Sequence, residues 1–269
     1  MYYLHGKNST ANNDLWSVYQ YGNIYKFVYY KYGFNNKIKN VNNVNIDNNI
    51  INDEKLKNNI SRAKSRIFEL AMCNKFDYFC TFTQNKKYRD RFDLDTFRKD
   101  FAQFVRNLNR NRKNKIKYLL IPEQHKKGGW HMHGLLSGLC EKSDLKKFKK
   151  SDYIPTRLKN MIDKGQDVFN WKLYQNKFGY FTCTKINNIQ ACSKYITKYI
   201  TKDLATNNIK LGKHLFFSSQ GLKGKDIILK NCFATCPINS WHFENDYIKL
   251  YEVKENEIDI DFNLYTTVF

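Results

Sequence analysis

Two histidines, His131 and His133, stand two residues apart in an apolar run that is typical of a buried strand. Residues i and i+2 of a strand point to the same face, so the two imidazoles should project side by side. The preceding turn at 126–129 contains paired glycines, which supply the positive φ angles that a tight hairpin needs. Two imidazoles on one face of a hairpin are half of a metal site.

A carboxylate from the other strand of this hairpin is expected to complete the site. If the register centres on Lys127, Glu123 lies across from His131 and shares a face with both imidazoles. The three side chains then offer two nitrogens and one oxygen, and this mixed donor set favours Mg²⁺ or Mn²⁺ over a structural zinc ion. If Glu123 instead faced away, Gln124 or His125 would be the next candidate ligand.

Two tyrosines on a predicted helix are candidate nucleophiles. Tyr195 and Tyr199 are four residues apart and therefore neighbours on one helix face, with Lys198 and Lys202 beside them. A tyrosine hydroxyl, with a pKa of about 10, needs an electrophile that is already polarised. A divalent ion in the histidine hairpin could polarise a phosphodiester for in-line attack, while the lysines offset charge on the phosphoryl oxygens. The product would be a phosphotyrosine link to DNA and a free hydroxyl.

Alternating strand and helix patterns surround these residues. Aromatic and β-branched runs predict strands at 24–32, 76–83, 116–123 and 178–186. Apolar residues at helical spacing predict helices that begin after Glu54, after Asp93 and after Asn188. The other segments are expected to be irregular or weakly structured: a lead-in at 1–22, a loop at 35–52, a surface helix with loops at 141–177, and a peripheral strand or two after 205.

The charge balance predicts a polyanionic partner, and nucleic acid fits best. The chain has 46 Lys and Arg against 25 Asp and Glu, a formal net charge of +21. An AT-rich genome would also raise the lysine content, but it would not crowd six arginines into 89–112. We expect DNA contacts from the strand threonines, the helix arginines and the hairpin lysines: Thr81, Thr83, Arg106, Arg110, Lys126 and Lys127.

The cysteines and the hydropathy pattern indicate a reducing, aqueous compartment. Seven cysteines are scattered through apolar runs, which predicts free thiols rather than a disulfide framework. No apolar run approaches the roughly 18 residues of a membrane helix, and the first ten residues are polar, unlike a signal peptide. We expect a soluble intracellular protein without a membrane partner.

Three motifs, in this order, resemble those of the HUH superfamily of replication initiators. That superfamily has an F-x-T-x-T strand, a histidine, hydrophobic, histidine strand and a YxxK helix, which stand here at 79–83, 131–133 and 195–202. The chain is similar in particular to the replication-initiator (Rep) proteins of small circular single-stranded DNA phages of the microvirus type, especially gokushoviruses. Those proteins also carry a carboxylate upstream of the histidines and a G-[FY]-x-x strand before the tyrosine helix. The resemblance covers roughly residues 54–204.

The resemblance implies an α+β fold with a central antiparallel sheet of about five strands, an RRM-like HUH endonuclease core on which helices pack. It implies an endonuclease and strand transferase that nicks a single-stranded origin, keeps the 5′ end on a tyrosine, leaves a 3′ hydroxyl primer and rejoins ends in rolling-circle replication. Two tyrosines imply alternating roles, and Tyr199, which has the fuller YxxKD context, is expected to act first. The chain lacks a GxxxxGK[ST] loop, so a helicase and a DNA polymerase of the bacterial host, in its cytoplasm, would extend the nick.

Three other functions are considered. A relaxase or transposase of the same superfamily would use the same chemistry, although relaxases usually carry a third histidine where Glu123 stands. A rolling-circle plasmid initiator is nearer. The different class is a non-catalytic basic module that binds single-stranded DNA or RNA on aromatic strands. In the initiator interpretation, 1–53 is an extension with a strand, 54–204 the catalytic core and 205–269 a peripheral region, while the oligomeric state stays open.

Overall fold

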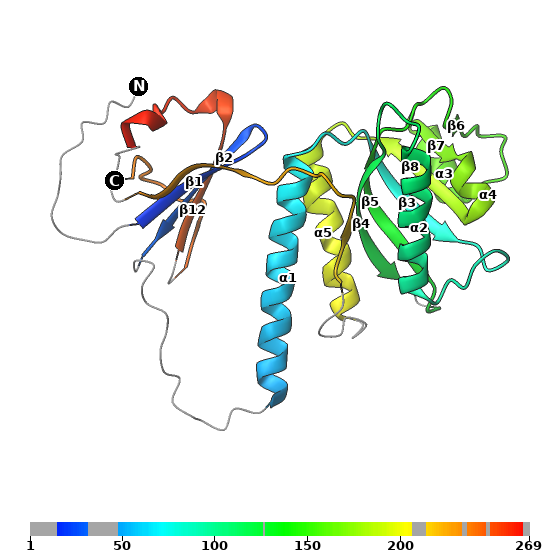
Figure 1. Ribbon diagram of the computed structural model, residues 1–269, viewed down its shortest axis with the longest axis horizontal. Coiled ribbons are helices and arrows are strands. Elements are labelled where there is room, and N and C mark those ends of the chain that lie inside the picture. Colours follow the sequence, from blue (N-terminus) through cyan, green and yellow to red (C-terminus); the bar gives the residue numbers. More distant parts are fainter. Residues whose placement is uncertain are drawn as a thin grey trace. The chain divides into compact units, whose positions relative to one another are not determined.

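The computed structural model describes residues 15–31, 48–125, 127–205, 214–232, 236–245 and 248–265. The chain forms two compact units. One is residues 49–223, and the other combines the two ends, 1–48 and 224–269 (Figure 1). The sequence-based division at residues 53 and 204 treated the two ends as separate segments. It did not anticipate their union, which follows from strand pairing between the ends.

The unit made from the two ends is a five-stranded antiparallel sheet in the order β10-β1-β2-β12-β11. Its strands are β1 (Leu15–Tyr21), β2 (Ile24–Tyr30), β10 (Asp226–Cys232), β11 (Phe243–Glu244) and β12 (Ile248–Lys254), with 3-10 turns at Glu255–Glu257 and Phe262–Tyr265. The strand predicted at 24–32 is confirmed. The unstructured lead-in predicted for 1–22 is wrong over β1, which packs Trp16 and Val18 into a small core and pairs with both β2 and β10. Residues 1–14 lie outside the described part.

The unit formed by residues 49–223 contains a seven-stranded antiparallel sheet in the order β6-β7-β8-β3-β5-β4-β9. Its strands are β3 (Tyr78–Gln84), β4 (Lys117–Gln124), β5 (Trp130–Ser137), β6 (Leu145–Lys147), β7 (Val168–Trp171), β8 (Gly179–Lys185) and β9 (Phe217–Ser218). The predicted α+β class with a central antiparallel sheet is confirmed. The sheet has more than the expected five strands, because β6, β7 and β9 are two to four residues long and carry too little alternation to be recognised.

Five helices accompany this sheet: α1 (Asn48–Met72), α2 (Leu94–Asn109), α3 (Thr156–Asp163), α4 (Lys172–Lys177) and α5 (Ile189–Ala205). The predicted helix starts at Asp93 and Asn188 are confirmed by side-chain caps. The Asp93 carboxylate accepts the Thr96 N–H at 3.0 Å, and the Asn188 side chain accepts the Ala191 N–H at 2.9 Å. Helix α1 begins earlier than predicted, because its first turns are too rich in Asn to show an apolar stripe.

The strand alternation divides the side chains of this sheet between two cores. Phe82 and Met132 point to one face and pack with Phe101 of α2 in an aromatic cluster. Ile121 and Leu135 point to the other face, where apolar residues of α1 and α5 cover them. Figure 1 shows α1 and α5 side by side on one side of the sheet and α2 on the other. Each fully buried large side chain contributes roughly 1.5–3 kcal/mol, so the central strands are held firmly from both faces.

The described helices and the cysteines agree with the sequence. No helix among the described residues is both long and apolar enough to span a membrane. All seven cysteines are free thiols, as predicted.

Candidate functional site

The hairpin of β4 and β5 brings the predicted ligands to one sheet face. Glu123 lies opposite His131 and Ile121 opposite His133, so the predicted register is confirmed. The Glu123 Oε2 atom is 2.7 Å from Nε2 of His133, whose side chain is almost buried. The imidazoles of His131 and His133 are parallel to within 9°, with 6.3 Å between ring centroids. Glu123 therefore faces the histidines, and no substitute ligand is needed.

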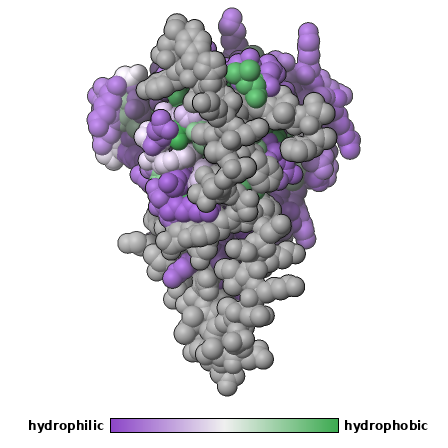
Figure 2. Space-filling view, turned by 90° about the vertical axis from the view of Figure 1, so that its left-hand side faces the viewer, coloured by the Kyte–Doolittle hydropathy of each residue, from purple (hydrophilic) through white to green (hydrophobic). Residues whose placement is uncertain are grey.

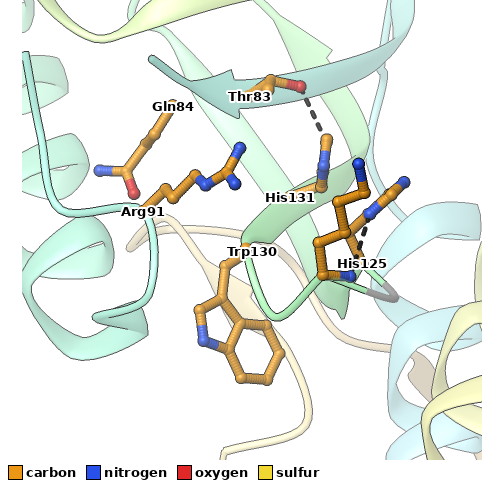
Figure 3. A pocket seen from close by; sticks show the side chains of 8 residues that line it. Thr83, Gln84, Arg91, His125, Trp130 and His131 are labelled. Atoms are coloured by element: carbon orange, nitrogen blue, oxygen red, sulfur yellow. Dashed lines mark hydrogen bonds between the residues drawn. The ribbon is translucent and has the colours of Figure 1, made fainter. Parts of the chain in front are cut away.

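Two threonines of β3 hold the imidazoles in place. Thr81 pairs with His133 and Thr83 with His131 across the sheet. Each threonine Oγ1 lies within hydrogen-bond distance of the opposite Nδ1, at 3.0 Å for Thr81 and 2.9 Å for Thr83; Figure 3 shows the second bond. A hydroxyl both donates and accepts, so it orients the ring in either tautomer and leaves Nε2 for another partner.

This role of the threonines was missed by sequence reasoning, which assigned them to DNA. The signal was present in the matched spacing of Thr81 and Thr83 with His131 and His133, since two strands with the same i, i+2 pattern can pair residue for residue. That pairing requires the strands to be neighbours, which the sequence alone did not show.

The three predicted ligands are close neighbours but do not converge on one point. Among the described residues, no group of three or more His, Cys, Asp or Glu side chains is arranged to hold a metal ion. Glu123 is engaged with Nε2 of His133, the atom that a ligand role would require. The donor chemistry nevertheless fits a divalent ion, because both Nδ1 atoms are taken by hydroxyls and both Nε2 atoms remain on the open side.

His131 is held in its neutral form. Burial lowers its pKa, and nearby His133, His125 and Arg91 lower it further, while Glu123 acts in the opposite direction. A neutral imidazole is the form that ligates a metal ion.

Helix α5 places both tyrosines above the histidines. The ring of Tyr199 stacks on His133, with 4.2 Å between centroids and 5° between planes. The Tyr199 hydroxyl donates to the Tyr195 hydroxyl at 3.2 Å, and Tyr195 rests edge-on against Phe79 with 43% of its surface exposed. The structure thus brings the two predicted nucleophiles to one point of the same sheet face.

Burial raises the pKa of the Tyr199 hydroxyl, and its bond to Tyr195 and the nearby charge of Glu123 raise it further. Arg157 of α3 acts in the opposite direction. Tyr199 is therefore protonated at neutral pH and must lose its proton during any attack.

The predicted lysines are placed less uniformly. Lys198 lies with its Nζ 5.9 Å from the centroid of the Tyr195 ring. Lys127 lies in the hairpin turn and lines a pocket beside His131. Lys126 and the side chain of Lys202 lie outside the described residues.

The two predicted arginines of α2 are not brought to the site. Arg106 and Arg110 lie on the helix that covers the opposite sheet face. They line a separate hollow of about 700 Å³ together with Arg98, Lys115 and Lys117, and no Asp or Glu is among its described lining residues. Any DNA contact made there is distinct from the tyrosine site.

The unit that carries the site also carries the excess positive charge. Of the 46 Lys and Arg, only nine lie in 1–48 and 224–269, against ten of the 25 Asp and Glu. The coloured surface in Figure 2, which shows one side of the molecule, is mainly hydrophilic. A polyanion would therefore be attracted to the unit of residues 49–223.

Residues 77–204 match a family model of replication-associated proteins, the ORF2 type. The matched part, slightly under half of the chain, contains the threonine strand, the histidine hairpin and the tyrosine helix. This part of the chain is therefore similar to replication-associated proteins. No curated protein and no solved structure matches the chain.

Proposed function

We propose that this protein initiates rolling-circle replication by nicking single-stranded origin DNA and joining its ends through tyrosine. The observation that carries the proposal is the juxtaposition of Tyr195 and Tyr199, with hydroxyls 3.2 Å apart, over the face of His131, His133 and Glu123. The match of residues 77–204 to a replication-associated family supports it. Neither the tyrosine pair nor the histidine pair is needed for binding alone.

The reaction is a transesterification. The Tyr199 oxygen attacks the phosphorus, the bond from phosphorus to the 3′ oxygen breaks, and the 3′ oxygen leaves as a hydroxyl that receives the proton given up by tyrosine. The 5′ end stays on Tyr199 as a phosphotyrosine. Because one phosphodiester replaces another, the strand can be rejoined without an energy source.

The residues of the site have distinct parts in this step. The Tyr195 hydroxyl lies where it can accept the proton of Tyr199, and Lys198 and Lys202 are assigned to the charge on the phosphoryl oxygens or the leaving group. His131, His133 and Glu123 would hold a Mg²⁺ or Mn²⁺ ion once Glu123 turns from His133. When bound, such an ion supplies Lewis-acid polarisation of the scissile phosphate.

Within this function, we place the chain with the initiators of the microvirus and gokushovirus type. The order of its motifs and its two tyrosines support that placement. Tyr199, which lies directly on His133, would open the cycle, and Tyr195 would attack when a new origin emerges. A host helicase and DNA polymerase would extend the 3′ end.

A covalent-adduct assay tests the proposal. Purified protein is incubated with labelled single-stranded DNA fragments of its replicon and Mn²⁺, and the products are separated on a denaturing gel. We expect an adduct with the wild type and with Tyr153→Phe, a matched control on a fully exposed tyrosine outside the site. The Tyr195→Phe, Tyr199→Phe double variant should give none. DNA binding without an adduct under any condition would leave the non-catalytic binding module as the better description.

A further inference from the structure

A small pocket lies beside His131 where β3 and β5 end. Its volume is about 240 Å³, below the roughly 300–1,000 Å³ of pockets for drug-sized ligands. Donor side chains from separate segments line it: Thr83, Arg91, His125, Lys127 and His131. No Asp or Glu is among the described residues that line it, so the pocket is arranged for a small anionic group.

Arg91 is held at this pocket by its surroundings. Its carbonyl accepts the Trp130 N–H at 2.8 Å, and the Trp130 indole donates to the carbonyl of Phe92 at 3.1 Å, which ties the loop before α2 to the hairpin. The aliphatic stem passes over Gly129, where a Cβ would lie 3.1 Å from Cδ of Arg91. Only glycine leaves the stem this room.

The charged end of Arg91 has a free donor. Its Nε is buried and has no hydrogen-bond partner among the described residues. In Figure 3 the guanidinium extends toward Thr83 and His131, with His125 across from it, while the Trp130 ring points away. A nucleobase would lack a stacking ring beside the guanidinium, whereas a phosphate would meet donors from several sides.

We infer that this pocket binds a backbone phosphate next to the one attacked by tyrosine, with Arg91 as its principal contact. The inference rests on the proposed function, since it assumes DNA as the ligand. The planar guanidinium matches two phosphate oxygens at once, and Lys127 and His125 add positive charge. Arg91 is thus a positioning residue that sets the register of the strand over Tyr199.

A binding experiment tests the pocket without cleavage. The parent protein carries Tyr195→Phe and Tyr199→Phe, and its affinity for labelled oligothymidylate is measured at several salt concentrations. Arg91→Met should weaken binding about tenfold or more and reduce the salt slope by about 0.7, the value for one phosphate of a single strand. Arg91→Lys should fall between, because it keeps the charge but loses the fork. Lys87→Met, an exposed cation of the same loop outside the pocket, is the matched control and should change little.

A second measurement locates the phosphate. On an oligonucleotide that the wild type cleaves, a neutral methylphosphonate beside the nick should weaken binding by the parent but not by Arg91→Met. Equal sensitivity of both proteins, or equal binding by Arg91→Met and Lys87→Met, would overturn the inference. An adduct that forms while Arg91→Met binds normally defeats only the pocket. Loss of binding in Arg91→Met with no adduct from the wild type defeats only the nicking function.

Discussion

Replacing Thr81 with valine tests whether the threonine strand positions the metal ligands. Valine keeps the size and the strand preference of threonine, so β3 should stay intact. The change removes the hydroxyl that lies 3.0 Å from Nδ1 of His133, a residue only 8% exposed. The imidazole then has a buried nitrogen without its partner and is free to rotate.

Two magnitudes follow from this contact. Leaving one buried polar atom unsatisfied costs about 1–3 kcal/mol of folding free energy. Loss of a hydrogen bond that orients a metal-ligating histidine typically costs about 10–100-fold in metal affinity. We therefore expect Thr81→Val to weaken Mn²⁺ binding by at least about tenfold while urea unfolding shows a loss of about 1–2 kcal/mol.

Calorimetric titration of Mn²⁺ and urea unfolding provide the measurement. Thr182→Val on β8 is the matched control, since Thr182 lies opposite Thr81 on the same sheet face but away from the histidines. Thr81→Ser should restore binding, because it keeps the hydroxyl. Wild-type Mn²⁺ affinity in Thr81→Val, with the stability loss present, would refute the positioning role and leave the threonine with a purely structural one.

Three further predictions concern the DNA surface, the sheet and pH. Replacing both Arg106 and Arg110 with Gln should weaken single-stranded DNA binding and lower its salt slope by about 1.4, if each contacts one phosphate; an unchanged slope would exclude them. Gly134→Ala should destabilise the protein by about 3 kcal/mol or more in urea unfolding, since its Cβ would lie 2.0 Å from the carbonyl oxygen of Leu119; wild-type stability would show that β4 can move. Burial, and then the charge of Glu141, raises the pKa of Tyr78 to about 12, so the folded state keeps a proton that the unfolded state loses near pH 10. The wild type should therefore lose about 1.3 kcal/mol more stability than Tyr78→Phe between pH 9 and 11, and a constant difference between them would contradict this.

The parts of the fold predicted from sequence were those with a strong local signal. The Glu123–His131 register followed from paired glycines in the turn, because turn length and face alternation determine register together. Helix α5 followed from its Asn188 cap and apolar spacing. These features depend on contacts between residues close in sequence.

What sequence reasoning missed depends on contacts between distant segments. Strand β1 gains its place from pairing with β10, more than 200 residues away, and its own pattern does not alternate cleanly. The position of Arg91 against Gly129 likewise requires the loop before α2 to meet the hairpin turn. Conversely, Arg106 has the right charge for DNA but lies on the wrong sheet face for the tyrosine site, since composition does not reveal which face a helix covers.

The tyrosine pair itself favours strand joining over simple hydrolysis. Burial keeps Tyr199 protonated, and the hydroxyl of Tyr195 stands 3.2 Å away as the nearest acceptor for its proton. Once a phosphotyrosine has formed on Tyr199, Tyr195 is within a side-chain rotation of the same phosphate, because residues four apart on a helix share one face. A second nucleophile at that distance allows the covalent end to be exchanged without moving α5. A hydrolase needs only water for its second step, so a site with two adjoining tyrosines is better suited to passing a DNA end from one tyrosine to the other.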